Sequence, residues 1–229
     1  MADFFMKGAA QSYDEKNRAL APIANAMHFL IRLILKDLPE NARILCVGVG
    51  TGAEILSLSK EYSGWTFVGV DPSSAMLDVC RERLVHAGVM DRCELVHGFI
   101  EDVSKEERFD AVVSVLVGHF IQREERINFY QNMHLRLVDG GYLVNTEISF
   151  DMESAEFPSM LKNWKSVQSL MGATPESLEA LPGLLKTALT VLPPSETESF
   201  IRASGFSLPV RFFQSFMIMG WYAEKGGQG

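Results

Sequence analysis

Three glycines and one aspartate have the residue types and spacing of a cofactor site. Gly48, Gly50 and Gly52 alternate after a short apolar run, and Asp71 lies further along the chain. Glycines let a ligand approach the backbone closely and leave N–H groups exposed where a helix begins. A carboxylate roughly 20 residues later can accept hydrogen bonds from two ribose hydroxyls. The spacing predicts a cofactor that contains a nucleoside.

The elements that must position these residues are a strand, a turn, a helix and a second strand. After Arg43, the residues up to Val47 are all β-branched or apolar, which predicts a buried strand over 43–47. The helix is expected from Ala53, and the second strand, 65–70, ends beside Asp71. Ligands of such α/β units bind at the carboxyl ends of the parallel strands, which is where these residues fall.

The glycine pattern leaves the nucleotide open. Gly48, Gly50 and Ala53 also satisfy the dinucleotide rule, so an NAD-linked oxidoreductase is an alternative. The helical arm predicted before the first strand and the extra glycine at position 52 count against NAD.

A family resemblance rests on several segments taken in order. These are residues 44–52, 68–77, 96–102, 109–115 and 137–144. Together they resemble the motifs of the class I S-adenosylmethionine (SAM) dependent methyltransferases. The resemblance implies SAM as cofactor and S-adenosylhomocysteine (SAH) as product.

The resemblance also implies a role for individual residues. The glycine loop would lie under the methionine part of SAM, Asp71 would hold the ribose, and Met76, Phe99 and Ile100 would border the adenine. The residues assigned to the cofactor in this way are Gly48, Val49, Gly50, Thr51, Gly52, Asp71, Pro72, Met76, Gly98, Phe99, Ile100 and Val115.

One position departs from the family pattern. The family usually has an acid two residues before the first glycine, where this chain has Cys46. A neutral thiol cannot orient the loop or bind the methionine ammonium as a carboxylate would. Glu54 is a candidate substitute, and its other interpretation is a favourable acid in the first turn of a helix.

For methyl transfer, a protein mainly has to align the nucleophile with the methyl group and exclude water. No catalytic sequence motif is required. His119, after the fourth predicted strand, is the candidate general base, with a hydrogen-bonded histidine as the alternative. Glu147, near the end of the fifth strand, and Tyr13, in the N-terminal arm, are further catalytic candidates. The histidines show no metal-ligand spacing, so no metal site is predicted.

The order of elements indicates an α/β fold. We expect a Rossmann-like, seven-stranded mixed sheet with one antiparallel strand, helices on both faces and a helical insertion. Strands are expected near 43–47, 65–70, 93–97, 109–115, 141–148, 206–214 and 216–224, and helices near 53–61, 73–86, 123–137, 154–170, 175–190 and 195–203.

We expect one domain with four parts. A helical arm, 1–40, precedes the SAM-binding core, 41–149. A helical insertion, 150–195, would cover the substrate, and residues 196–229 would complete the sheet. Ser195 followed by Glu198 predicts a capped start of the last helix.

The tail of the chain is similar to one subgroup, the carboxy-SAM synthases, in residues 195–199, 203–206 and 212–216. That subgroup pairs its extra carboxylate with an arginine of the insertion, and here no arginine lies between Arg136 and Arg202. The asparagine that the subgroup has after strand four is Val115 in this chain. We therefore expect ordinary SAM and methyl transfer, with carboxy-SAM or tRNA-related chemistry as the alternative.

The acceptor is expected to be a small molecule. Phe157, Met160, Trp164 and Met171 of the insertion either line an apolar acceptor pocket or pack as core. A SAM-binding protein without turnover is the non-enzyme alternative, which Cys46 keeps open.

The charge and the hydrophobic pattern of the sequence indicate which binding partners and which cellular compartment to expect. The formal net charge of −8 counts against unaided binding of long nucleic acid. No signal sequence is evident, and Arg32 and Lys36 interrupt the apolar stretch 26–38. We expect a cytoplasmic protein without a membrane partner. The apolar arm is compatible with a homodimer, a lid over the cofactor or packing on the sheet.

Overall fold

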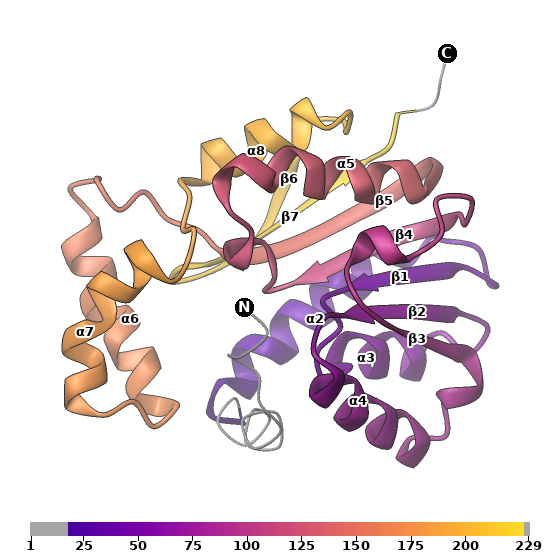
Figure 1. The fold of residues 1–229 in the computed structure, drawn as a ribbon, viewed down its shortest axis with the longest axis horizontal. Helices are drawn as coiled ribbons and strands as arrows, with labels where there is room; N and C mark the ends of the chain where they lie inside the picture. The colour runs from indigo at the N-terminus through magenta and orange to yellow at the C-terminus, as the bar shows by residue number, and fades with distance from the viewer. Residues whose placement is uncertain (1–17, 227–229) are drawn as a thin grey trace.

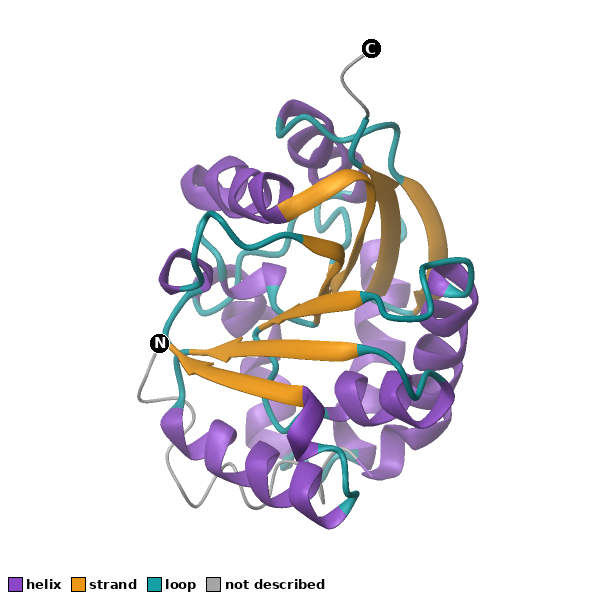
Figure 2. Ribbon diagram, turned by 90° about the vertical axis from the view of Figure 1, so that its right-hand side faces the viewer, coloured by secondary structure: helices purple, strands orange, loops and turns teal. Residues whose placement is uncertain are grey.

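A twisted sheet of seven strands in the order β3-β2-β1-β4-β5-β7-β6 forms the centre of the protein (Figures 1 and 2). The structure is a computed structural model that describes residues 18–226. The strands β1 to β5 pair in parallel, and β7 runs antiparallel to both β5 and β6. The predicted mixed sheet is therefore confirmed. The strands are β1 (Arg43–Val47), β2 (Thr66–Asp71), β3 (Cys93–His97), β4 (Phe109–Val115), β5 (Leu137–Ile148), β6 (Val210–Ser215) and β7 (Ile218–Glu224).

Helices cover both faces of the sheet because its central strands are apolar on both sides. Figure 1 shows α2, α3 and α4 below the sheet and α5 and α8 above it. Two apolar clusters result, one on each face. These helices are α2 (Ala21–Leu35), α3 (Ala53–Glu61), α4 (Ser74–His86), α5 (Arg126–Arg136) and α8 (Pro194–Ala203).

The fifth strand starts at Leu137 rather than at residue 141. Leu137 pairs with Phe109, and regular pairing resumes at Ala111 and Tyr142 after a register shift. Gly140, with φ of 78°, lies in the irregular stretch and allows the chain to rejoin β4.

The predicted cap of the last helix is wrong. The helix begins at Pro194, which places Ser195 inside the first turn, and no side chain caps it. Proline is favoured at a first helical position because its missing N–H has no partner there in any case. Glu198 instead accepts hydrogen bonds from Arg211 Nε and, at 2.9 Å, from Trp221 Nε1.

Helix α2 packs on the sheet along one side only. Met27, Ile31 and Leu35 are buried in the core, whereas Phe29 and Leu33 are 50% and 46% exposed. By length and composition only, one helix of the described chain, Arg18–Leu35, would suffice to cross a membrane. The sequence pattern placed the apolar stretch at 26–38, where Arg32 and Lys36 interrupt it. The helical segment instead begins at Arg18 and ends before Lys36, so it is longer and less charged than expected.

The insertion forms a pair of helices, α6 (Phe157–Leu170) and α7 (Pro175–Thr187), beside the sheet in Figure 1. Trp164, Val167 and Leu185 are buried where the two helices join the main core. The chain returns next to the end of β5, where Phe150 N donates to Leu192 O at 3.0 Å.

Candidate cofactor and active site

A cavity of about 280 Å³ opens at the carboxyl ends of β1, β2 and β4. This is the edge at which ligands of open α/β sheets bind. Most of its wall is apolar. The described residues that line it are Val47, Gly48, Gly50, Val70, Asp71, Pro72, Ser73, Met76, Gly98, Phe99, Ile100, Glu101, Val115, Leu116, Val117, Phe120, Ile121, Glu125 and Phe129.

The glycine loop forms the floor of this cavity because only glycine fits it. Gly48, Gly50 and Gly52 have φ of 67°, 52° and 80°, a region that other residues rarely adopt. A Cβ on Gly48 would lie 2.4 Å from Val117 Cγ2 on the opposite wall. The loop therefore lets the backbone come close to whatever occupies the cavity.

Asp71 joins the glycine loop to the second motif. Its Oδ2 accepts from Gly50 N at 2.9 Å, and its Oδ1 accepts from Ser73 N at 2.8 Å. Burial raises the pKa of the carboxyl group, and the N–H groups of Ser73 and Gly50 oppose the rise. Because each oxygen has a second lone pair, Asp71 can still accept from hydroxyls in the cavity.

The residues expected to border the adenine line the cavity. Met76 and Ile100 are buried, and Phe99 lies at the rim with 57% of its surface exposed. Gly98 has no space for a side chain, since a Cβ would lie 2.2 Å from Asp102 Oδ2.

Three residues assigned to the cofactor do not line the cavity. Val49 is buried in the core beneath the loop. Thr51 is buried and accepts from Arg83 Nη1 through its carbonyl and hydroxyl oxygens, at 2.9 and 2.7 Å. Gly52 caps the start of α3. All three support the loop from behind.

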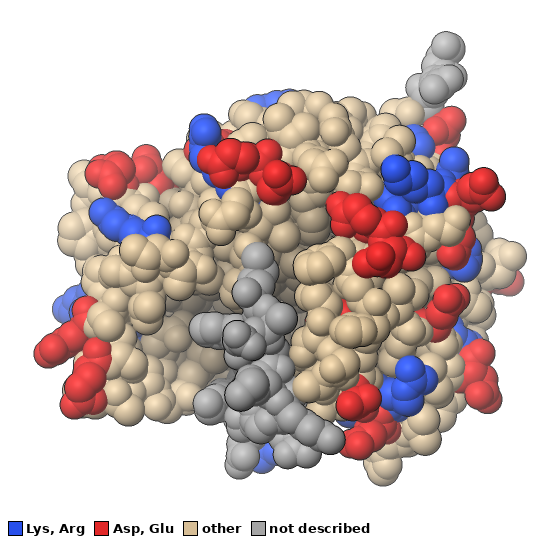
Figure 3. Space-filling model, viewed as in Figure 1, with Lys and Arg blue, Asp and Glu red and all other residues tan. Residues whose placement is uncertain are grey.

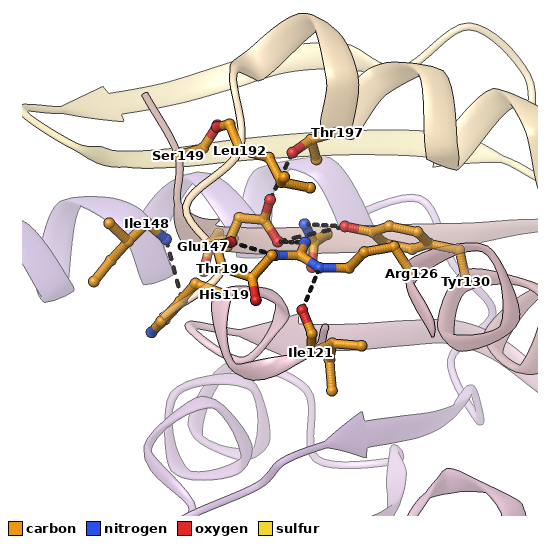
Figure 4. Close-up of polar contacts among 12 residues, drawn as sticks. His119, Ile121, Arg126, Tyr130, Glu147, Ile148, Ser149, Thr190, Leu192 and Thr197 are labelled. Carbon is orange, nitrogen blue, oxygen red and sulfur yellow. Dashed lines mark hydrogen bonds and ion pairs between the residues drawn. The ribbon is translucent and has the colours of Figure 1, made fainter. Parts of the chain in front are cut away.

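The structure does not bring the catalytic candidates to the cavity. His119 is 3% exposed and lies outside the described lining, with its Nδ1 accepting from Ile148 N at 3.2 Å (Figure 4). Burial and the nearby Arg126 lower the pKa of His119 to about 3, so the imidazole is neutral. Tyr13 lies outside the described residues.

Glu147 is fully buried, as part of an ion pair. Its Oε2 accepts from Arg126 Nη1 at 2.7 Å, and its Oε1 accepts from Thr197 Oγ1 at 2.7 Å (Figure 4). Arg126 also donates to the carbonyl oxygens of Ile121, at 3.0 Å, and Thr190, at 2.8 Å. The pair joins the sheet, the cavity wall and the end of the insertion. The pairing with Arg126 accounts for the burial of Glu147 without a catalytic role.

Gly118 is required by this arrangement. A Cβ there would lie 1.7 Å from Glu147 Oε2 and 3.1 Å from Arg126 Nη1. The loop 117–121, which contributes Val117, Phe120 and Ile121 to the cavity wall, is therefore held against the ion pair.

Part of the cavity wall was not predicted. Leu116, Val117, Phe120, Ile121 and Phe129 come from the segment that follows β4 and from α5. These residues form no short motif. From the sequence alone, apolar residues in such a segment can be interpreted equally well as part of the hydrophobic core or as part of a cavity wall. Leu116 has φ of 59°, a strained value that only the folded chain reveals.

The charge inside the cavity is negative. Asp71, Glu101 and Glu125 line it, and no lysine or arginine between residues 18 and 226 does. The site therefore suits a positively charged group and disfavours an added carboxylate.

Three of the four apolar residues of the insertion pack in or against the core instead. Trp164 is 3% exposed, and Phe157 and Met160 pack against the same core cluster. None of the four, Met171 included, lines the cavity.

Similarity to known proteins was found at the level of domain, sequence and fold. A family described as "Methyltransferase domain" matches residues 44–141. The carboxy-S-adenosyl-L-methionine synthase of Shewanella halifaxensis is 26% identical over 195 residues, which cover 84% of this chain and 80% of that protein.

Solved structures share the fold. A putative O-methyltransferase from Nostoc punctiforme has a TM-score of 0.69 at 16% identity and covers 91% of this chain. Human N-acetylserotonin methyltransferase, solved in complex with SAM, has a TM-score of 0.67 at 14% identity and covers 97%. This chain spans 58% and 57% of the lengths of those two chains.

The comparisons decide between the two nucleotide cofactors. The matched domain contains the glycine loop, Asp71 and the residues expected to border the base, and the human neighbour was solved in complex with SAM. The cavity fits this cofactor, since it combines a floor without side chains, a carboxylate and apolar walls. The chain contains a match to a methyltransferase domain at residues 44–141 and shares its fold with solved methyltransferases.

Proposed function

We propose that this protein transfers the methyl group of SAM to a small, partly apolar acceptor. The observation that carries the proposal is the cavity beside the glycine loop, with apolar walls, acidic residues and no described cation. Bound SAM supplies a methyl group on a positively charged sulfonium, which makes the methyl carbon electrophilic.

The residues of the chain would bind and orient SAM and would exclude water from the cavity. Asp71 would hold the ribose, the backbone at Gly48 and Gly50 would carry the amino-acid end, and Met76 and Ile100 would enclose the base. The apolar loop 117–121 keeps water from the remaining space, which favours transfer over hydrolysis.

No described histidine lines the cavity. We therefore propose that alignment, rather than proton abstraction by His119, provides most of the catalysis. An acceptor whose nucleophilic atom is already unprotonated fits this arrangement best.

The acidic surface supports a small acceptor over a polyanion. On the face in Figure 3, lysine and arginine side chains lie scattered among aspartate and glutamate. With a net charge of −8, this surface offers no evident track for a phosphate backbone.

A cytoplasmic location and a homodimer also belong to the proposal. Cys46, Cys80 and Cys93 are all free, which fits a reducing compartment. Phe29 and Leu33 of α2 are exposed apolar residues that a second copy would cover.

Carboxy-SAM chemistry is the second candidate, because relatives such as the Shewanella protein are carboxy-SAM synthases. The positions of the lysines of the insertion argue against carboxy-SAM chemistry, because none of these lysines lines the cavity. Lys162 and Lys186 are exposed, and Lys186 lies 3.7 Å from Glu153.

Two measurements test the proposal. Native mass spectrometry of the purified protein should show bound SAM or SAH, and a carboxylated derivative would instead support the second candidate. Release of SAH from SAM should then depend on one member of a panel of small phenols, thiols and amines. Retention of SAM with no release across the panel would favour a binding protein without turnover.

A further inference from the structure

Leu116 has a backbone conformation that leucine rarely adopts. It follows directly on β4, which ends at Val115, and its φ is 59°. In this left-handed conformation the Cβ comes close to the following carbonyl oxygen, so a residue with a branched side chain keeps it only where its surroundings hold it there. Backbone strain of this kind gathers at functional sites, which raises the question of what the leucine does.

A buried threonine of β5 holds this backbone. Leu116 N donates to Thr146 O at 2.8 Å and also lies 3.1 Å from Thr146 Oγ1. Thr146 is 0% exposed, and Val115 pairs with it in the sheet. The central sheet therefore fixes the conformation of Leu116 and, with it, the place from which the side chain starts.

Leu116 connects the cavity wall to the core that contains the insertion. It lines the cavity and packs against the first apolar cluster, to which Trp164 and Leu185 of the insertion belong. Among the described residues that line the cavity, only Val115 shares this property. The second cluster, on the opposite face of the sheet, takes the lining residues Val47, Val70, Ile100, Val117, Ile121 and Phe129. The insertion therefore meets the cavity wall at Val115 and Leu116.

The three groups on the sulfonium of SAM need different surroundings. The ribose needs an acceptor such as Asp71, and the charged amino-acid end needs polar backbone groups such as those of the glycine loop. The methyl group instead needs an apolar wall that excludes water and still leaves one direction open to the acceptor. Val115 and Leu116 supply an apolar wall on the side where the insertion would cover an acceptor.

We propose that Leu116 determines which acceptors reach the methyl group of SAM. The inference rests on the proposed methyl transfer. Leu116 closes the cavity on the side of the insertion and leaves room for an unhindered nucleophilic atom, such as one at the end of a chain or on the open edge of a ring. An acceptor that is branched beside its nucleophilic atom would collide with this side chain. The strained backbone holds the leucine where it has this effect.

The test uses two stable analogues of SAM in which a nitrogen atom replaces the sulfonium. One carries a methyl group on that nitrogen and the other a benzyl group, and calorimetric titration of the full chain gives the affinity for each. Wild type should prefer the methyl analogue by about 10- to 100-fold, because the benzyl group overfills the space beside Leu116. Leu116→Gly adopts the left-handed backbone without strain and lacks the side chain, so the preference should fall by about the same factor. Leu116→Ala, which shortens the side chain without freeing the backbone, should show the same change.

Ile121→Ala is the matched control. Ile121 lines the same cavity but packs against the second cluster, so its removal should leave the preference for the methyl analogue as in wild type. The inference is wrong, while the use of SAM stands, if wild type binds both analogues equally or if the two Leu116 variants keep the wild-type preference. An equal loss of preference in Ile121→Ala would also overturn it. If wild type binds neither analogue and no SAH, the proposed function and the inference both fail.

Discussion

The buried ion pair between Arg126 and Glu147 gives the most direct test of how the cavity wall is held. Both side chains are 0% exposed, and Nη1 and Oε2 are 2.7 Å apart. In Glu147→Gln the guanidinium stays buried beside a neutral amide. Removing one partner of a buried pair costs about 3–5 kcal/mol, so the free energy of unfolding should fall by that amount.

This loss is large enough to measure in two ways. In a chain of this size 1 kcal/mol corresponds to roughly 2–4 °C, so the melting temperature should fall by about 6–20 °C. Urea unfolding of wild type, Arg126→Met, Glu147→Gln and the double variant gives the coupling. The double variant should lose less than the sum of the singles because it leaves no charge uncompensated.

The same variants report on the cofactor site. Arg126 holds the carbonyl of Ile121, which lines the cavity, so SAH affinity should fall in each single variant at temperatures where the protein is still folded. Glu153→Gln is the matched control, since its contact with Lys186 is exposed and 3.7 Å long, and it should change neither property. A loss below about 1 kcal/mol in Glu147→Gln, or strict additivity in the double variant, would refute the reasoning.

Three further predictions concern single residues. Asp71→Asn should lower SAH affinity by roughly 10- to 100-fold because the ribose loses a charged acceptor, and calorimetry showing unchanged affinity would remove Asp71 from the site. Gly48→Ala should destabilise the chain by about 1–2 kcal/mol and abolish tight SAH binding, whereas Gly172→Ala, at φ of 86° with open space around it, should show the strain and no binding defect. The unfolded chain protonates His119 near pH 6.5 and the folded chain only near pH 3, so its contribution to stability is complete above pH 6.5 and is lost by about 1.4 kcal/mol per unit as the pH falls. Urea unfolding at pH 7 and 5 should show a smaller loss for His119→Gln than for wild type, and equal losses would contradict the buried, neutral imidazole.

Local patterns were sufficient for the fold and for bringing most of the predicted cofactor residues to one cavity. Gly48, Gly50 and Asp71 lie where a strand, a turn and a second strand must bring them, because parallel strands place their carboxyl ends at one edge. Strand and helix periodicity likewise placed the seven strands, with errors at their ends such as the early start of β5.

The roles of single polar residues depended on long-range contacts. Glu147 is paired with Arg126 and Thr197, which lie 21 and 50 positions away in the chain, and no periodicity encodes such a meeting. His119 has the position expected of a base but points its Nδ1 at a backbone N–H of β5. Glu54 shows the converse, since a residue that reads as a solvated first-turn acid is buried beneath the loop. Spacing along a chain sets which element carries a side chain, whereas burial and partners are set by elements that meet only after folding.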